Sequence, residues 1–504
     1  MQFSQESIDL KYGDDLSLDK GMCPSPLAAP RGVALLALTR QSAMNMTGGI
    51  VSQALKFFVI MYVARRFSVP EFGLFSFAVA VNAYVFIIAN FGLPMFGSRA
   101  VANSGVVSRD LVIQICCSRS CLALLTTLVA VGSLAFVPGI SRLELQLIGL
   151  FGMSNLAQAG LFDWAFQGLH QQEISALLNV IWQGGWLGLT ILSVRMGLGV
   201  RGVALALIVS ALAASGIGYL ILSTATALQI AKFDKRSLFQ RSWGMLKSAA
   251  PLGWGTLLIT IIVWSDVVFV RSIRGELAAG LYAAGNRGSL ALAMLASMYV
   301  QGAFPLLSRM SAQGTVVFSR YFQRCYEDMA LCFLPGSVWA ILYAPEIILT
   351  VFRKPEYLPA VPIFRVFQVI FLLTASWNLY GTGIIIAFHR DHAYQKVLAL
   401  TAGFFLPLCA LLTKLAGVWG ASLAVLSAQA FCLLAFMEKS RGLVHVNHRS
   451  ALLLPLLVGL VVASISKILG LGLISSAMVL SLAYAGIILI RFRGLHSTWG
   501  VSQG

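Results

Sequence analysis

Charged residues are scarce in this sequence: Asp, Glu, Lys and Arg make up 11% of its 504 residues, whereas apolar residues make up 58%. Soluble domains carry ~25% charged residues, so this composition excludes an ordinary soluble protein. With a mean hydropathy of +0.83, the chain has more apolar surface than one globular core buries, and that surface must face lipid. Acidic residues are the scarcest: 19 against 36 basic residues give a net charge of +17. Surplus cations in a membrane protein serve either topology or anionic ligands.

Motifs of common enzyme and metal-binding classes are also missing. The sequence has no Walker-type Gly-Lys-Ser/Thr loop and no glycine fingerprint between a strand and a helix. The eight cysteines lack zinc-site spacing, and we interpret them as apolar packing residues. The longest predicted loops, 226–245 and 306–327, are too short to house a nucleotide site or a catalytic pocket. We therefore predict no catalytic residues, no metal, no cofactor and no nucleic-acid partner.

Many segments are long enough to cross a bilayer, since ~20 residues at 1.5 Å each span ~30 Å of hydrocarbon. We predict fourteen spans, at residues 43–64, 71–95, 110–138, 144–166, 171–195, 199–225, 246–270, 282–305, 328–352, 359–388, 394–414, 418–437, 450–469 and 471–491. With the N-terminus inside, cytoplasmic segments hold 21 of the 36 basic residues and outer segments hold 11. The positive-inside rule thus favours cytoplasmic N- and C-termini.

Two short motifs recur in the same order along the chain. Residues 73–78 (GLFSFA) are echoed by 280–285 (GLYAAG), and residues 199–202 (GVRG) by 417–420 (GVWG). Each copy lies six predicted spans after the first, so both copies enter the membrane in the same direction. This pattern predicts a duplication into parallel six-helix lobes, which is a known transporter architecture. We expect the glycines to allow close helix approach.

The expected fold is an all-α polytopic membrane protein with about 14 transmembrane helices, arranged as two parallel six-helix lobes plus two C-terminal helices. We expect a disordered cytoplasmic tail at residues 1–42, an N-terminal six-helix lobe at 43–225 and a cytoplasmic linker at 226–245. A C-terminal six-helix lobe follows at 246–437, and two extra helices with a short tail occupy 438–504.

Several strings resemble one known family. Residues 64–75 (ARRFSVPEFGLF) look like the first-loop signature of bacterial polysaccharide flippases, in the oligosaccharidyl-lipid branch of the MATE-like superfamily. Residues 163–169 (DWAFQGL) resemble a string typical of O-antigen (Wzx-type) flippases, and residues 304–309, 356–360 and 417–421 fit later landmarks. The resemblance covers residues 40 to 440.

One departure from the family pattern follows the second string. His170 and Gln171 stand where an acidic residue is usual, and Glu173 comes two places later. The role that the usual acid would have is therefore not carried over to this chain.

The resemblance implies a transporter and not an enzyme. It would flip polyprenyl-diphosphate-linked oligosaccharides across the bacterial cytoplasmic (inner) membrane, by alternating access of two lobes, for O-antigen, exopolysaccharide or capsule synthesis. The implied partners are the lipid-linked oligosaccharide, membrane lipids, a polysaccharide polymerase and a chain-length regulator.

Basic residues inside the predicted spans are the candidate substrate site. Each costs ~2.5–3.5 kcal/mol if it faces lipid at mid-bilayer, so some should face a wet cavity that attracts anions. Lys56 and Arg119 lie deepest, and Arg287 and Arg365 lie nearer the outer face. For each cation the alternative is a hydrogen bond within a lobe or a snorkelling side chain. Arg99, at an inner span end, and Asn45, a neutral hydrogen-bonding group, complete the predicted substrate-binding set.

Two acidic residues are candidates for coupling or gating. Asp266 lies in the seventh span at a depth similar to that of Arg287, and the two readings are an ion pair within the lobe or a coupling-ion site. Asp163 lies near the cytoplasmic end of the fourth span, beside Trp164, and we interpret it as structural or gating.

Other functions compete with this one. A multidrug or cation antiporter of the same superfamily would favour acidic over basic groups inside the membrane. A peptidoglycan-precursor flippase would have the same fold and a similar basic cavity. A membrane polysaccharide polymerase would carry a substantial external loop, whereas no predicted external loop exceeds about a dozen residues.

Overall fold

The structure is a computed structural model that describes residues 31–137, 139–225, 235–484 and 486. Within these residues every regular element is a helix. Ten helices are long and apolar enough to cross a membrane, or eleven if the bent pair α10 (Thr315–Leu342) and α11 (Ala344–Phe352) is one span. A shorter apolar helix covers Leu473–Tyr484. The chain is therefore a multi-pass membrane protein.

The two longest helices each contain a fold-back at a glycine. In α9 (Lys235–Ser311) the backbone reverses at Gly275, with φ 85°, and in α13 (Asp391–Ser440) it reverses at Gly417, with φ 61°. Positive φ strains any residue with a side chain, so glycine suits both turns. Rings 27 positions apart in α13, Phe404 and Phe431, lie 5.2 Å apart, as expected of an antiparallel hairpin. Each of these helices therefore supplies two of the predicted spans.

The N-lobe consists of the helices that precede the gap at residues 226–234. They are α1 (Arg31–Arg66), α2 (Val69–Asn90), α3 (Leu93–Ser104), α4 (Arg109–Ala135), α5 (Arg142–Ala159), α6 (Asp163–Gly168), α7 (Gln172–Arg195) and α8 (Gly199–Ala225). Sequence signals place several starts: Ser68 caps α2 and Ser141 caps α5, each in a capping box with a glutamate three residues later.

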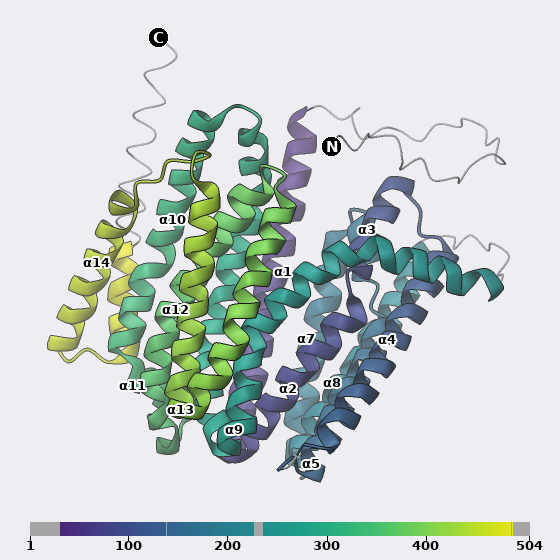
Figure 1. Ribbon diagram of the computed structural model, residues 1–504, viewed down its shortest axis with the longest axis horizontal. Helices are drawn as coiled ribbons and strands as arrows, with labels where there is room; N and C mark the ends of the chain where they lie inside the picture. The colour runs from purple at the N-terminus through teal and green to yellow at the C-terminus, as the bar shows by residue number, and fades with distance from the viewer. Residues whose placement is uncertain (1–30, 138, 226–234, 485, 487–504) are drawn as a thin grey trace.

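The C-lobe consists of α9, α10, α11, α12 (Val361–Tyr380) and α13, with the short helices η2 (Pro355–Ala360) and η3 (Gly381–Ile386). Helix α14 (His448–Ile468) packs on α10, and Trp339 of α10 donates a hydrogen bond to Ser476 of the last helix at 3.1 Å. The two C-terminal helices are thus attached to the C-lobe (Figure 1).

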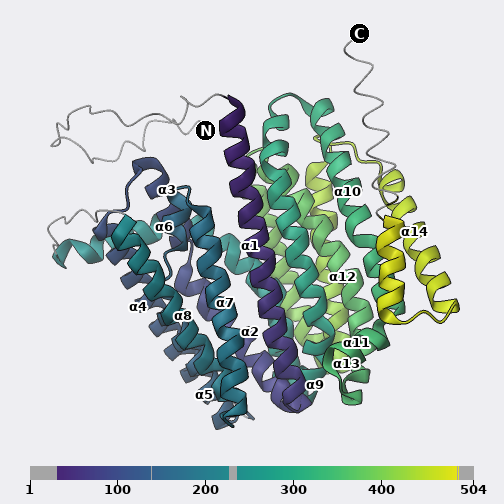
Figure 2. The same cartoon turned by 180° about the vertical axis from the view of Figure 1, so that it is seen from behind.

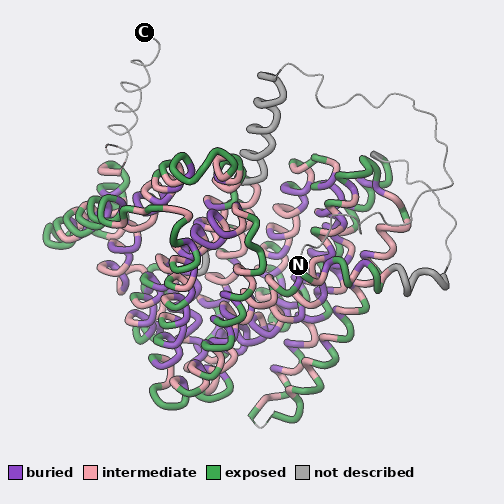
Figure 3. The backbone as a smooth tube through the Cα atoms, turned by 45° about the horizontal axis from the view of Figure 1, so that its top comes forward, coloured by how far each residue is buried: buried purple, intermediate pink, exposed green. Residues whose placement is uncertain are grey.

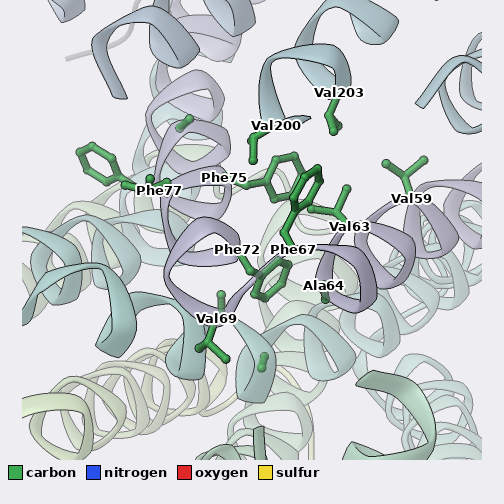
Figure 4. Close-up of a cluster of buried hydrophobic side chains, with 14 of the residues drawn as sticks. Val59, Val63, Ala64, Phe67, Val69, Phe72, Phe75, Phe77, Val200 and Val203 are labelled. Carbon is green, nitrogen blue, oxygen red and sulfur yellow. The ribbon is translucent and has the colours of Figure 1, made fainter. Parts of the chain in front are cut away.

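The lobes lie side by side and are closest at one end, the lower end in Figure 1, while they splay apart at the other (Figures 1 and 2). We call the lower one the convergent end; it carries the turns at residues 67–68, 136–137, 139–141, 196–198, 275, 353–354 and 417. Its core contains Phe67 from the turn after α1, and Phe72 and Phe75 from α2, as Figure 4 shows, together with Phe352 and Tyr357 of the C-lobe. One hydrophobic cluster therefore joins both lobes.

Burial follows the expectation for a bundle in lipid. Buried residues lie where helices face one another, and exposed residues cover the outer surfaces (Figure 3). The exposed residues include large apolar side chains, among them Leu124, Leu125, Leu128 and Val129 on α4. An apolar exterior of this kind suits contact with lipid.

Two predicted boundaries differ from the structure. Helix α1 begins at Arg31, inside the expected tail of residues 1–42, because the apolar run 33–38 continues the helix; residues 1–30 lie outside the described part. Helix α9 begins at Lys235, inside the expected linker of residues 226–245, of which residues 226–234 are outside the described part.

Candidate functional site

The candidate site is built around two cations on opposite lobes. Lys56 is half-buried on α1, which packs against α7 of the N-lobe, and Arg287 lies on α9 of the C-lobe. Their charges are near enough to repel each other. The guanidinium of Arg287 lies 5.0 Å from the ring centre of Trp264, a cation–π contact. Only 5% of Arg287 is exposed, and its Nε and Nη2 find no hydrogen-bond partner among the described residues. Two of its buried donors are therefore available to an anion.

An apolar cavity of about 420 Å³ adjoins Arg287. Its walls come from both lobes and from the last helix: Phe57 and Met61 of α1, Phe364 of α12, and Leu480 are among them. The buried Gln368 also lines it, with an Oε1 that accepts no hydrogen bond within the described part of the chain. The cavity is thus a largely apolar space with a cation in its wall.

A second cavity, of about 430 Å³, lies inside the C-lobe and contains Asp266 in its wall. The Asp266 carboxylate accepts hydrogen bonds from Tyr282 Oη at 2.8 Å, from the Asn286 amide at 3.4 Å and from the backbone N–H of Val267 at 2.7 Å. None of the ion pairs between described residues joins Asp266 to Arg287. The alternative of a direct ion pair therefore does not match the contacts.

Arg119 has a structural position that differs from the predicted one. Its guanidinium donates to the backbone carbonyls of Gln158, Ala159 and Leu161, at 2.9, 3.3 and 3.2 Å. These carbonyls lie at the C-terminus of α5, where the helix breaks before α6 and leaves acceptors without helical partners. A cation there also complements the helix dipole. We correct the substrate-facing expectation: Arg119 caps a broken helix inside the N-lobe.

The string at residues 163–169 contains α6, the short helix that follows the break after α5. Trp164 is buried, and a Cβ on Gly97 of α3 would lie 2.6 Å from its ring. A Cβ on Gly168 would lie 2.7 Å from the Ser98 carbonyl. Asp163 is close to Arg119 and to the side chain of Asn179. The string therefore packs α6 against α3, and the geometry favours the structural reading of Asp163.

Arg365 and Arg99 do not line the cavity beside Arg287. Arg365 is exposed, and its Nε donates to the Ile341 carbonyl of α10 at 3.1 Å, which is a hydrogen bond within the C-lobe. Arg99 is exposed on α3. Asn45 lies on α1, and its side chain is outside the described residues.

The sequence reasoning missed Trp264 and Gln368, because aromatic and amide side chains in an apolar span carry no signal of their own. It also did not single out Glu144, the first residue of the predicted span 144–166, or Arg271, the residue after the span 246–270, although they meet between the lobes. Among the residues that the structure describes, no group of three His, Cys, Asp or Glu side chains is arranged to hold a metal.

Comparisons with known proteins agree with this architecture. Residues 38–311 match the model of a family described as polysaccharide biosynthesis protein. A lipid II flippase, MurJ, in an inward closed conformation has a similar structure, with a TM-score of 0.72 and 13% identity over 90% of this chain and 99% of that one. A point mutant of the Vibrio cholerae MATE transporter VcmN gives a TM-score of 0.55 and 16% identity over 80% and 96% of the two chains. At 13% and 16% sequence identity, these similarities show a shared fold only. No curated protein matches the sequence.

Proposed function

Because this chain belongs to the polysaccharide biosynthesis protein family and is a multi-pass membrane protein of the flippase or transporter class, we propose that it flips polyprenyl-diphosphate-linked oligosaccharides from the cytoplasmic to the outer leaflet. The resemblance to polysaccharide flippases of the MATE-like superfamily is thereby confirmed at the level of family and fold. The product would feed surface polysaccharide synthesis at the bacterial cytoplasmic membrane.

The observation that carries this proposal is the pair of cations, Lys56 and Arg287, on facing lobes. A diphosphate placed between them would accept hydrogen bonds from the free Nε and Nη2 of Arg287. Charge-assisted hydrogen bonds to arginine are strong and directional, and phosphate groups match the guanidinium geometry. It would also relieve the repulsion between the two positive charges.

The apolar cavity beside Arg287 supports the same class of substrate. A polyprenyl-diphosphate sugar carries an apolar tail next to its anionic group, and this cavity has an apolar lining with a cation in its wall. Part of the tail would lie there while the rest stays in lipid. An organic cation, the cargo of the competing antiporter, would meet two positive charges at this point and would be repelled.

We further propose that the convergent end faces the outside and the splayed end faces the cytoplasm, with both chain termini in the cytoplasm. The support is the excess of basic residues in the segments at the splayed end, under the positive-inside rule. A polymerase and a chain-length regulator acting on the outer face would be the downstream partners.

A second candidate is a peptidoglycan-precursor flippase, because a lipid II flippase is among the proteins that share this fold. Against it stands the family match, which covers residues 38–311 and names polysaccharide biosynthesis. The two candidates differ in glycan, so a substrate comparison separates them.

Reconstitution in liposomes tests the proposal. We expect flipping of a fluorescent polyprenyl-diphosphate oligosaccharide, read as its appearance in the opposite leaflet, and little flipping of a neutral glycolipid with the same tail and glycan. Equal rates for the two lipids would contradict an anion site. Faster flipping of a peptidoglycan precursor than of any oligosaccharide tested would favour the second candidate, and uptake of organic cations alone would favour an antiporter.

Asp266 is our proposed coupling-ion site, on the strength of its buried carboxylate in the C-lobe cavity. Asp266→Asn removes the charge while keeping the shape, so we expect flipping that no longer responds to an imposed proton or sodium gradient. Tyr282→Phe is the matched control, because it removes one hydrogen bond to the carboxylate but not its charge. If Asp266→Asn keeps the full gradient dependence, coupling lies elsewhere.

A further inference from the structure

A buried ion pair connects the two lobes at the convergent end. Arg271 of α9 binds Glu144 of α5 through two parallel contacts, Nε to Oε1 at 2.6 Å and Nη2 to Oε2 at 2.7 Å. The Arg271 Nη2 also donates to the backbone carbonyl of Gly139 at 3.0 Å. Glu144 is fully buried and Arg271 is 6% exposed. This is the geometry in which arginine binds a carboxylate most specifically.

The carboxylate of Glu144 is held in place by its own helix. Its Oε2 accepts the backbone N–H of Ser141 at 2.7 Å, and the backbone N–H of Glu144 donates to Ser141 Oγ at 3.2 Å. This capping box fixes the Glu144 side chain at the N-terminus of α5 independently of its contact with Arg271. Glutamine also completes such a box, so Glu144→Gln removes the charge and leaves the cap.

The same end has a second, reciprocal set of contacts between the lobes. The C-terminus of α1 and the C-terminus of α11 lie together, and each receives a cation from the other lobe. Arg65 of α1 donates to the carbonyls of Thr350 and Val351, at 2.9 and 2.7 Å. Lys354 donates to the Phe67 carbonyl at 2.6 Å, and Tyr357 to the Ala64 carbonyl at 3.2 Å. Because two helix C-termini repel each other, cations are needed where they meet.

Neither set of contacts belongs to the cationic site. The residues concerned lie at the turns of the convergent end, and they join main chain and side chains of one lobe to those of the other. A conformational change that parts the lobes here must break all of them. Separating Glu144 from Arg271 exposes to water two charges that are buried together in this state. The free-energy difference between the closed and the open convergent end therefore depends on both residues.

We propose that Glu144 and Arg271 form a latch that holds the convergent end shut and that opens and re-forms in each transport cycle. The inference rests on the proposed alternating access of the two lobes. In this reading the pair sets the balance between the two states and takes no part in binding cargo, while the contacts of Arg65, Lys354 and Tyr357 act beside it.

Distances between the lobes test the latch without any substrate. Spin labels at Met196 and Leu415, exposed positions in convergent-end turns of opposite lobes, report its width in nanodiscs by pulsed electron paramagnetic resonance. Glu144→Gln leaves the buried Arg271 with only its longer ion pair, to Glu276 of its own lobe at 3.4 Å, so the ratio of wide to narrow states should shift by about tenfold or more. Arg274→Gln is the matched control, because Arg274 lies three residues further along and bonds only carbonyls of its own lobe, those of Thr413 and Lys414.

The double variant gives a signature of pairing that a general loss of stability would not give. Arg271→Gln alone should widen the convergent end like Glu144→Gln, whereas the two together should shift the ratio by less than the product of the single effects. If Arg271→Gln fails to accumulate, Arg271→Lys replaces it, because lysine keeps the positive charge but cannot make the two parallel hydrogen bonds of the guanidinium. Unchanged distances in both single variants, or fully multiplicative effects, would overturn the latch. Because no cargo is present, this result is independent of which lipid the protein flips.

Discussion

Arg287→Ala should lower the rate of lipid flipping in liposomes by about 10- to 100-fold, the effect expected when hydrogen bonds of a charged group worth about 1.5–3 kcal/mol are lost. The buried guanidinium offers Nε and Nη2 to the substrate, and alanine offers nothing in their place. Lys56→Ala should act in the same direction, since Lys56 supplies the second positive charge at the site. Both variants should still accumulate in the membrane, because removing either cation relieves a repulsion.

Arg365→Ala is the control for this prediction. Arg365 is also an arginine in a C-lobe span, but it is exposed and donates only to the Ile341 carbonyl. We expect near-parent flipping by this variant. Arg287→Lys separates charge from geometry: partial activity would show that positive charge suffices in part. Parent-level flipping by Arg287→Ala would refute the anion site.

Gly280→Ala should block the narrow state of the convergent end and stop transport. A Cβ on Gly280 of α9 would lie 2.1 Å from the Val69 carbonyl oxygen of α2, and a Cβ on Gly73 of α2 would lie 2.0 Å from the Glu276 carbonyl oxygen. These obstacles are backbone atoms, so one methyl group must push the helices apart. Overpacking of this kind costs about 1–3 kcal/mol, which shifts the balance of states by about 10- to 100-fold.

The spin-label distance between the lobes and the flipping rate measure this effect. Gly216→Ala on α8 is the matched control, since its Cβ would meet nothing within 4 Å. We expect the control to flip lipid at the parent rate and Gly280→Ala to hold the convergent end wide. A narrow convergent end with normal transport in Gly280→Ala would show that these helices do not need their close approach.

The positions of the spans were predictable because hydropathy is a local signal. The second predicted span, residues 71–95, begins two residues after the start of α2 at Val69. The repeated glycines were also informative. Gly73 and Gly280, noted as equivalent positions of a duplication, face each other across the lobe boundary, where close helix approach requires them.

The partners of the charged residues could not be predicted, because sequence indicates how deep a residue lies but not which way its helix is turned. Arg119 lies on α4, in the third predicted span, yet it reaches the carbonyls of a break after Ala159 that hydropathy does not reveal. Glu144 and Arg271 are 127 positions apart and belong to different lobes. Asp266 was predicted at a depth similar to that of Arg287, but the side chains that donate hydrogen bonds to it are those of Tyr282 and Asn286.

Because Lys56 and Arg287 lie on different lobes, their repulsion affects the loaded and the empty protein differently. The two cations are already within range of each other's charge in this state, in which the splayed end is open. Under the proposed function, a diphosphate between them would replace this repulsion by attraction, so the loaded carrier would be favoured over the empty one. The proposed return step would require the anion to leave on the far side. Net direction would therefore follow from how quickly the outer leaflet is cleared of product, and a stalled polymerase would slow the flippase without touching it.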